Sequence, residues 1–264
     1  MSKIKTLYFD GEKTSYKQFL FLKKLAKGAG IACKEGDNPA TRLRLIKTKQ
    51  EIKALQKSSD LLVKSVAFAK TKLKEGVTEI EIAKAFEIYA LKHGAEKLSF
   101  ETIVAFGANS SMPHHRSGSK KLKKSDCVLI DAGLFVDNYA SDMTRFFFQE
   151  NTNKEMKKIY AIVREVHKEV LLAIKPGVKV KYLGELATKI TKEHGYKTVH
   201  ALGHGVGLEV HETPRISTAA KEEYVLEENM VITIEPGIYV PSLGGVRYED
   251  MLLITKNGYK NFYK

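Results

Sequence analysis

The chain has 264 residues, 43% of them hydrophobic and 28% charged. This composition is typical of a globular protein with one large domain or two small ones. It contains no run of ~18 apolar residues, and its first residues lack the apolar core of a secretion signal. The two cysteines, Cys33 and Cys127, form no CxxC pair, which fits a reducing compartment. These features predict a cytoplasmic protein with no membrane partner.

The formal net charge of +13 is concentrated in the first half of the chain. Residues 1–130 contain 26 basic and 13 acidic residues, whereas residues 131–264 contain 18 of each. The excess is mostly lysine, and no aromatic residues interleave with it as single-strand nucleic-acid binders require. We interpret it as a solvated basic surface and predict no nucleic-acid partner.

Residues 1–40 predict too few elements for an independent core. They read as a strand at Thr6–Phe9, a helix at Ser15–Gly28 and a loop at Lys34–Ala40. Residues 41–264 therefore form the main domain.

An internal repeat with an offset of 101 residues organises the main domain: KEGV at 74–77 recurs as KPGV at 175–178. Apolar residues at helical spacing follow each copy. Each of these helices ends at a His-Gly pair, with glycine suited to a left-handed cap. A further amphipathic helix precedes each copy, at about 47–73 and 154–174. The offset is too long for a solenoid repeat, so it indicates a duplicated half-domain.

After each pair of helices the pattern changes to strands. The predicted strands are 101–106, 127–135 and 141–148 in the first half, and 230–235, 237–240 and 246–255 in the second. Helices with mixed or antiparallel strands predict an α+β domain with internal pseudo-symmetry.

Two aspartates lie close to a predicted hairpin. Asp131 ends the apolar run CVLI, and Asp142 follows after a turn at Asp137-Asn138. A hairpin would bring the two carboxylates together across adjacent strands. Because they repel each other, a cation is their natural partner.

The second half supplies a similar set. Glu235 ends VITI before Pro-Gly, and Glu249 shares a face with Arg247 in VRYED. The stretch GHGVGLEVHETP at 203–214 carries His204 and His211; if it is extended, the two imidazoles point to opposite faces and do different jobs. Four carboxylates and an imidazole favour manganese, cobalt, iron or zinc over copper, and they suit two ions.

The segments DAGLFVDNYASDMTR, HALGHGVGLEVHETP, TIEPGIY and VRYED together resemble the pita-bread metallopeptidases, peptidase family M24, in the Xaa-Pro aminopeptidase and prolidase branch. The resemblance covers about residues 41–264. It implies a pita-bread fold, with two pseudo-symmetric α-β halves around a curved antiparallel sheet. It also implies a site for two divalent metal ions, with manganese expected first and cobalt, zinc or iron as alternatives. The implied metal ligands are Asp131, Asp142, His204, Glu235 and Glu249.

The same resemblance implies roles around the metals. His114, His211 and Glu235 would be catalytic, and His114, His200, His211 and Arg247 would bind the substrate. His211 would donate to the scissile carbonyl oxygen as it becomes an oxyanion. Arg247 would pair with a ligand carboxylate. His115, next to His114, receives no role.

The activity implied first is that of an Xaa-Pro aminopeptidase, acting on peptides with proline at the second position. The alternatives are an Xaa-Pro dipeptidase (prolidase) and then a methionine aminopeptidase; His200, Arg247 and the PHH motif argue against the latter. A metal-free pseudoenzyme or interaction module is a different class, disfavoured because all five ligand positions are filled. By resemblance, residues 1–40 would be the remnant of an N-terminal creatinase-like domain, and a homodimer is possible.

Overall fold

The computed structural model describes residues 4–11, 13–36, 39–221 and 224–263, which cluster into two compact units, Met1–Arg44 and Leu45–Lys264. In the first unit, β1 (Thr6–Phe9) pairs in parallel with β2 (Ala32–Glu35), and α1 (Tyr16–Gly28) connects them. The helix α2 (Pro39–Leu45) follows.

The predicted loop at Lys34–Ala40 is wrong in part. Lys34 and Glu35 belong to β2, and Pro39 begins α2, while residues 37–38 lie outside the described residues. The polar sequence ACKE has no strand pattern of its own. Its backbone becomes a strand because β1 offers a parallel partner, which local sequence does not reveal.

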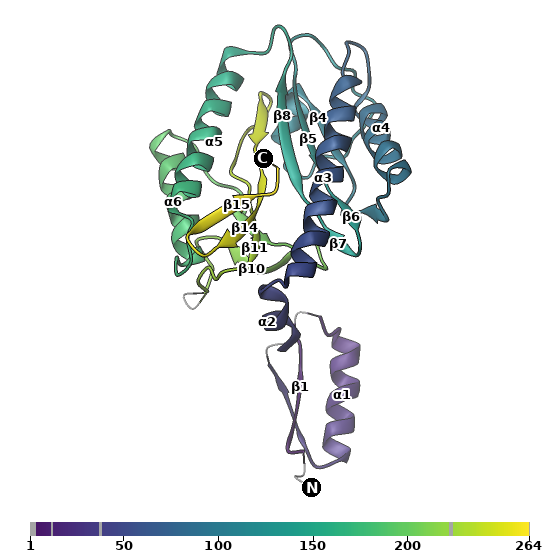
Figure 1. Cartoon of the computed structure of the whole chain (residues 1–264), viewed down its shortest axis with the longest axis vertical. Coiled ribbons are helices and arrows are strands. Elements are labelled where there is room, and N and C mark those ends of the chain that lie inside the picture. Colours follow the sequence, from purple (N-terminus) through teal and green to yellow (C-terminus); the bar gives the residue numbers. More distant parts are fainter. Residues whose placement is uncertain (1–3, 12, 37–38, 222–223, 264) are drawn as a thin grey trace. The chain divides into compact units, whose positions relative to one another are not determined.

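Four long helices surround the strands of the second unit (Figure 1). They are α3 (Lys49–Thr71), α4 (Glu79–Lys92), α5 (Lys154–Ala173) and α6 (Val180–Glu193). Thr48 and Thr78 begin α3 and α4 with capping boxes, in which each threonine hydroxyl accepts a backbone N–H of a glutamate three residues on. In the part of the chain that the structure describes, no helix combines the length and apolarity needed to span a membrane.

The duplication predicted from the repeat is present in the backbone. Gly76 and Gly177 have φ angles of 86° and 85°, a left-handed conformation that favours glycine. Each donates its N–H to a strand-like segment, Gly76 to the Leu122 carbonyl and Gly177 to the Leu226 carbonyl. The two halves therefore enter α4 and α6 through the same turn.

The strands form small antiparallel sheets. The first half contributes β3 (Lys97–Leu98), β4 (Ile103–Phe106), β5 (Cys127–Ala132), β6 (Leu134–Val136), β7 (Tyr139–Ala140) and β8 (Met143–Phe148). The second half contributes β9 (Gly203–Gly205), β10 (Glu212–Ile216), β11 (Val231–Ile234), β12 (Gly237–Val240), β13 (Gly244–Arg247), β14 (Asp250–Thr255) and β15 (Gly258–Asn261). The sheet orders are β4-β5-β8, β3-β6-β7, β10-β9-β11-β14-β15 and β12-β13.

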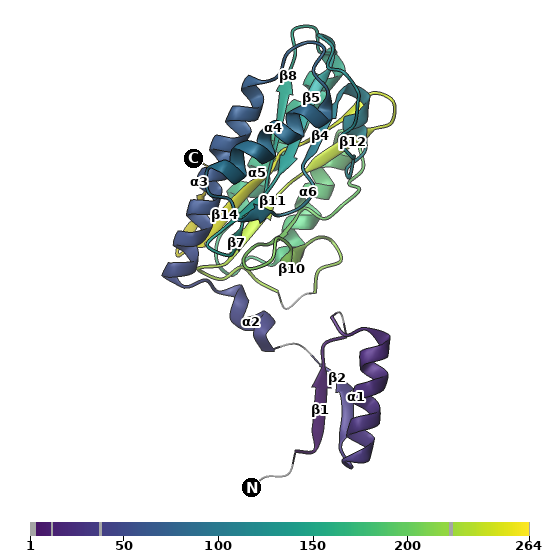
Figure 2. The ribbon, with the colours of Figure 1, turned by 90° about the vertical axis from the view of Figure 1, so that its right-hand side faces the viewer.

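Each half contains a two-stranded ribbon that is interrupted halfway. In the first half, β5 and β6 pair with β8 and β7, and the breaks lie at Gly133 and at 141–142. In the second half, β11 and β12 pair with β14 and β13, and the breaks lie at 235–236 and 248–249. Figure 2 shows the second ribbon as a long band from β14 to β12. The predicted single strands 127–135 and 246–255 are thus each two strands.

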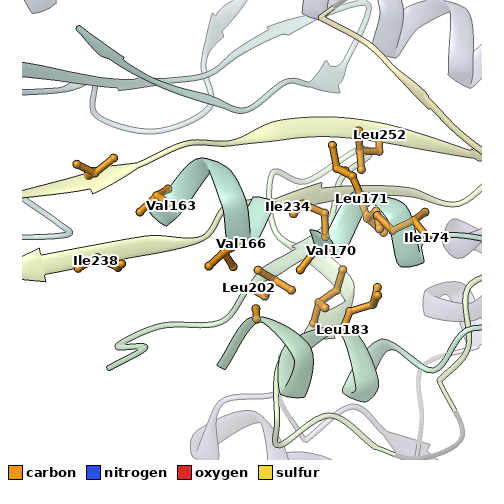
Figure 3. Packing of buried hydrophobic residues seen from close by; sticks show 14 of the residues in the cluster. Val163, Val166, Val170, Leu171, Ile174, Leu183, Leu202, Ile234, Ile238 and Leu252 are labelled. Atoms are coloured by element: carbon orange, nitrogen blue, oxygen red, sulfur yellow. The ribbon is translucent and has the colours of Figure 1, made fainter. Parts of the chain in front are cut away.

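The core lies between the helices and these ribbons. Val163, Val166 and Val170 of α5 face Ile234 of β11 and neighbouring strands (Figure 3). A second cluster packs α3 and α4 against β4 and β5, with Phe86 and Phe106 fully buried. The strands β4 and β5 contribute residues to both clusters, so they pack against helices on both faces. Helices packed on antiparallel strands confirm the predicted α+β class.

Candidate metal centre

The five residues predicted as metal ligands all lie at the interruptions of the ribbons or beside them. Asp131 is the second-last residue of β5, and Asp142 directly precedes β8. Glu235 directly follows β11, and Glu249 directly precedes β14. An interrupted ladder re-aims side chains, so acidic groups from both halves can point at one place.

The fifth predicted ligand, His204, lies in β9 beside the second ribbon. A Cβ atom at the preceding Gly203 would overlap the Thr233 carbonyl oxygen, so glycine permits this close approach of β9 to β11. His204 Nε2 lies 3.6 Å from Asp142 Oδ2 and 3.6 Å from Glu235 Oε1.

The ligand atoms gather in three overlapping groups, with the atoms of each group within 4.8 Å of one another. These groups are Asp131–Asp142–Glu249, His204–Glu235–Glu249 and Asp142–His204–His211. The tertiary structure thus brings all five predicted residues together, with His211 at the edge.

The donor set fits divalent cations. Asp131 Oδ1 and Glu249 Oε1 are buried atoms without a hydrogen-bond partner, a costly arrangement unless something positive binds them. Burial, reinforced by the neighbouring carboxylates, raises the pKa values of Asp142 and Glu249 well above their ordinary values. Burial also raises the pKa of Glu235 to about 8. Carboxylates that resist ionisation because they are buried next to one another are stabilised in the charged form by a bound cation.

His204 is held in the form that a metal requires. Burial, followed by the nearby His211, lowers the pKa of His204 to about 4, so its ring is neutral at neutral pH. Its Nδ1 lies 3.0 Å from the Gly205 carbonyl oxygen, which can only accept, so Nδ1 carries the proton. The Nε2 lone pair is then free to face Asp142 and Glu235.

Arg247 provides positive charge beside this cluster. Its Nη2 donates to Asp131 Oδ2, and its Nε donates to the Thr144 hydroxyl at 3.1 Å. Thr144 in turn donates to Glu249 Oε2 at 2.9 Å. Two of the acidic groups are therefore oriented by one guanidinium, directly or through a hydroxyl.

A second branch of this network reaches His200. Arg247 Nη1 donates to the Tyr239 hydroxyl at 2.5 Å, and that hydroxyl lies 2.9 Å from His200 Nε2. His200 Nδ1 donates to the Ala201 carbonyl at 2.7 Å, so Nε2 is the acceptor for Tyr239. Burial lowers the pKa of His200 to about 4, which keeps this ring neutral.

The two remaining predicted histidines are exposed at the edge of the cluster. The His211 ring centroid lies 4.4 Å from that of His204. The condition under which the two rings would point to opposite faces, an extended segment, is not met, because the chain turns between β9 and β10, which pair antiparallel. His114 follows the 3-10 helix η1 (Gly107–Ser111), and its charge lowers the pKa values of His200 and His211.

Sequence reasoning missed three residues around the cluster. Thr144 connects Arg247 to Glu249 by hydrogen bonds, and Tyr239 connects Arg247 to His200. Arg215 is exposed in β10, the strand that pairs with β9, which carries His204. Its position four residues after His211, in HETPR, was the available signal.

The protein has two pseudo-symmetric halves around one buried cluster of carboxylates and histidine. This arrangement is that of the pita-bread proteins, with a candidate dinuclear metal centre between the halves. Residues 53–256 match the family model described as metallopeptidase family M24, and the chain belongs to this family.

Known relatives cover most of this chain. An Xaa-Pro dipeptidase of Pyrococcus furiosus is 46% identical over 233 residues, which are 88% of this chain and 66% of that protein. An Xaa-Pro dipeptidase of Pyrococcus horikoshii is 44% identical over 92% of this chain and 70% of its own length. This chain thus spans about two thirds of the length of these relatives.

Solved structures share the fold. The prolidase from Pyrococcus furiosus superimposes with a TM-score of 0.90 at 42% identity, covering 98% of this chain and 76% of that chain. The X-Pro aminopeptidase from Thermotoga maritima superimposes with a TM-score of 0.86 at 32% identity, covering 99% of this chain and 74% of that chain.

The pKa shifts predict how the stability of the metal-free protein depends on pH. In the unfolded chain Glu235 ionises near 4.5, whereas in the folded protein it keeps its proton up to about 8. The folded state therefore binds more protons between these values, and stability falls as pH rises. His204, whose pKa falls from 6.5 to about 4, acts in the opposite direction, but only below pH 6.5. The melting temperature measured in chelator should fall from pH 6.5 to pH 8.

Saturating Mn²⁺ provides the control for this measurement. A metal needs deprotonated ligands, so it should raise the melting temperature more at pH 8 than at pH 6.5. A metal-free melting temperature that is constant or rises across this window would contradict the assigned shifts.

Proposed function

We propose that the protein is a metal-dependent Xaa-Pro dipeptidase, which hydrolyses the bond between an N-terminal residue and a C-terminal proline. Two relatives at 46% and 44% identity carry the name Xaa-Pro dipeptidase, whereas the X-Pro aminopeptidase of Thermotoga maritima is 32% identical. These likenesses favour the dipeptidase over the aminopeptidase that the sequence alone placed first. The aminopeptidase becomes the second candidate.

One structural observation supports the dipeptidase in particular. Arg215 is exposed in β10, the strand that pairs with β9, which carries His204 of the cluster. An Xaa-Pro dipeptide bears a free carboxylate on the residue that follows the scissile bond, whereas a longer peptide has an amide there. A guanidinium is suited to bind such a carboxylate with charge-assisted hydrogen bonds. We therefore assign Arg215 to the C-terminal carboxylate of the substrate.

The five clustered residues would hold two divalent ions, with manganese first and cobalt, zinc or iron as alternatives. When bound, such ions polarise a carbonyl group and lower the pKa of water. Asp131, Asp142 and Glu249 would neutralise their charge, and the neutral His204 would offer Nε2. Arg247 would hold Asp131 in place.

The remaining steps fall to side chains of this chain. In the metal-free protein burial raises the pKa of Glu235 to about 8, so it keeps its proton at neutral pH. Bound cations would hold it ionised, and it could then accept a proton from the attacking water and later release it. The nitrogen of the scissile amide must gain a proton to leave as an amine, and in a prolyl bond this nitrogen has no N–H with which to donate to the enzyme. His211, neutral because partial burial lowers its pKa, would donate to the developing oxyanion. His114 would contact the substrate from the loop that follows η1. His200, which is hydrogen-bonded to the Tyr239 hydroxyl, would help to hold the substrate.

A panel of substrates tests the proposal. Protein stripped of metal with a chelator and reloaded with Mn²⁺ or Co²⁺ should cleave Xaa-Pro dipeptides, and the stripped protein should not. Cleavage of Xaa-Pro-Yaa tripeptides at a comparable rate would favour the aminopeptidase. Release of methionine from Met-Ala-Yaa alone would favour a methionine aminopeptidase. No turnover of any of them would favour a pseudoenzyme.

Replacement of Arg215 by methionine should raise KM for an Xaa-Pro dipeptide by ~10- to ~100-fold, the equivalent of one lost charge-assisted contact. The corresponding Xaa-Pro amide, which has no carboxylate, should be cleaved by the variant and the unchanged protein with similar KM values. Steady-state kinetics on both substrates measure this difference.

The matched control is Arg42→Met, an exposed arginine in the first unit. It should leave both KM values unchanged. Equal losses on the dipeptide and its amide in Arg215→Met would contradict the assigned contact.

The cytoplasmic location, the possible homodimer and the assignment of residues 1–40 to a creatinase-like remnant stay predictions. Cell fractionation tests the location, and measurement of the mass in solution tests the homodimer.

A further inference from the structure

The PHH motif contains a second histidine, His115, to which neither the resemblance nor the proposed function gives a role. Its Nε2 lies 2.8 Å from Oε2 of Glu79, the first residue of α4. The Glu79 side chain is fully buried, and that of His115 is 10% exposed. Burying a carboxylate destabilises the folded state unless hydrogen bonds or ion pairs compensate for the lost hydration, so the contacts of Glu79 stabilise the fold.

In the described part of the chain, the donors that hydrogen-bond to the Glu79 carboxylate come from one segment, residues 106–118. Oε1 accepts the Phe106 N–H at 2.8 Å and the Asn109 side-chain amide at 2.8 Å. Oε2 accepts His115 Nε2 at 2.8 Å and the Gly118 N–H at 3.1 Å. One carboxylate at the N-terminus of a helix, where negative charge is favoured, thus fastens a loop at four points.

His115 donates from Nε2 in this arrangement. Oε2 of Glu79 already accepts the Gly118 N–H, so we assign the proton of this contact to Nε2. Asn109 Nδ2 and His115 Nε2 lie 3.4 Å apart. Both atoms are then donors, so this contact is not a hydrogen bond. Both groups are instead directed at Glu79.

The residue between the fixed points is His114. On its N-terminal side, the Pro113 carbonyl accepts Arg247 Nη1 at 3.4 Å. On its C-terminal side, His115 is held by Glu79, and the His115 N–H donates to the Met112 carbonyl at 3.1 Å. His114 itself is exposed. Arg247, which contacts the Pro113 carbonyl, also donates to Asp131, so this segment lies beside the candidate metal centre.

We propose that Glu79 and His115 form a buried anchor that positions His114 for the substrate, so that His115 is a positioning residue of the active site. The function of the anchor rests on the proposed peptidase activity. That Glu79 and His115 order the loop and fix His114 does not depend on the proposed activity. A side chain displaced by 1 Å can cost ~100-fold in rate, so an exposed histidine on a loop needs such support.

The test compares His115→Ala with His115→Gln, because the glutamine amide can donate from the place of Nε2. With Mn²⁺-loaded protein and an Xaa-Pro dipeptide, His115→Ala should lower kcat/KM by ~10- to ~100-fold. His115→Gln should restore most of this loss. The Mn²⁺ affinity measured by calorimetry should be unchanged in both variants, since His115 does not belong to the ligand cluster. His93→Ala, an exposed histidine at the end of α4, is the control and should retain full activity.

A double-mutant cycle separates positioning from general damage. If His115 acts through His114, adding His115→Ala to His114→Ala should cost less than ~2-fold more, because coupled residues are not additive. Losses that multiply would overturn the proposal, as would equal losses in His115→Ala and His115→Gln.

A measurement without substrate distinguishes failure of the anchor from failure of the proposed function. Hydrogen exchange of residues 107–118 should accelerate in His115→Ala and stay slow in His115→Gln, and the His114 ring resonance should shift in the former only. If the unchanged protein cleaves no Xaa-Pro peptide but these changes occur, the peptidase proposal fails and the anchor stands. Unchanged exchange and an unchanged resonance in His115→Ala would overturn the anchor, whatever the activity.

Discussion

Replacement of Glu235 by glutamine is expected to lower kcat on an Xaa-Pro dipeptide by ~10²- to ~10⁴-fold, the usual worth of a positioned general base. Glu235 combines two properties that this role requires. Its Oε1 lies 3.6 Å from His204 Nε2, within the ligand cluster, and burial raises its pKa to about 8. Glutamine keeps the shape but can neither accept the proton nor supply negative charge, so Mn²⁺ affinity should fall as well. Stopped assays and calorimetry on the same preparation measure both effects.

Glu228→Gln is the matched control, because Glu228 is exposed and lies seven residues earlier in the same region of the chain. It should retain activity and metal affinity. Turnover of Glu235→Gln close to that of the unchanged protein, with both metals bound, would contradict the role of Glu235.

Replacement of His211 by alanine is expected to remove ~2–4 kcal/mol of transition-state stabilisation, a loss of ~30- to ~1000-fold in kcat/KM. His211 is exposed beside His204, and burial of part of its ring lowers its pKa, which keeps it neutral with one N–H to donate. It lies at the edge of the cluster, so the variant should bind Mn²⁺ almost normally.

His204→Ala provides the comparison. It removes the buried nitrogen that faces Asp142 and Glu235, so it should lose metal affinity together with activity. If His211→Ala empties the site while His204→Ala does not, the two histidines have the opposite roles.

Local sequence determined most of the helices and the duplication. Thr48 and Thr78 each precede a glutamate at the capping-box spacing, and helices begin directly after both. The predicted helices 47–73 and 154–174 correspond to α3 (Lys49–Thr71) and α5 (Lys154–Ala173). These signals are readable because capping and helical periodicity act within a few residues of the chain. The repeat at Gly76 and Gly177 is readable for the same reason, since both need the left-handed conformation.

The strand breaks were decided by tertiary contacts. The run CVLIDAGLF was predicted as one strand, yet it divides at Gly133, where a Cβ atom would overlap the Ser141 carbonyl oxygen. VRYEDMLLIT divides at 248–249, opposite the Pro236 break of the partner strand, and the Tyr248 N–H donates to the Pro236 carbonyl. A break of this kind depends on what lies across the ladder, which residue types alone do not report.

The sequence also identified the chemistry of the cluster, because carboxylates at the ends of apolar runs are unusual and costly wherever they fold. It named the five groups, but their convergence needed two half-domains to place their ribbon breaks side by side. It could not find Thr144 or the carboxylate of Glu79, which look like ordinary polar residues in the chain. Their significance comes from burial and from partners distant in sequence: Thr144 donates to Glu249, 105 residues away, and Glu79 accepts from His115, 36 residues away. Such pairs are set by packing between elements, so only the tertiary structure reveals them.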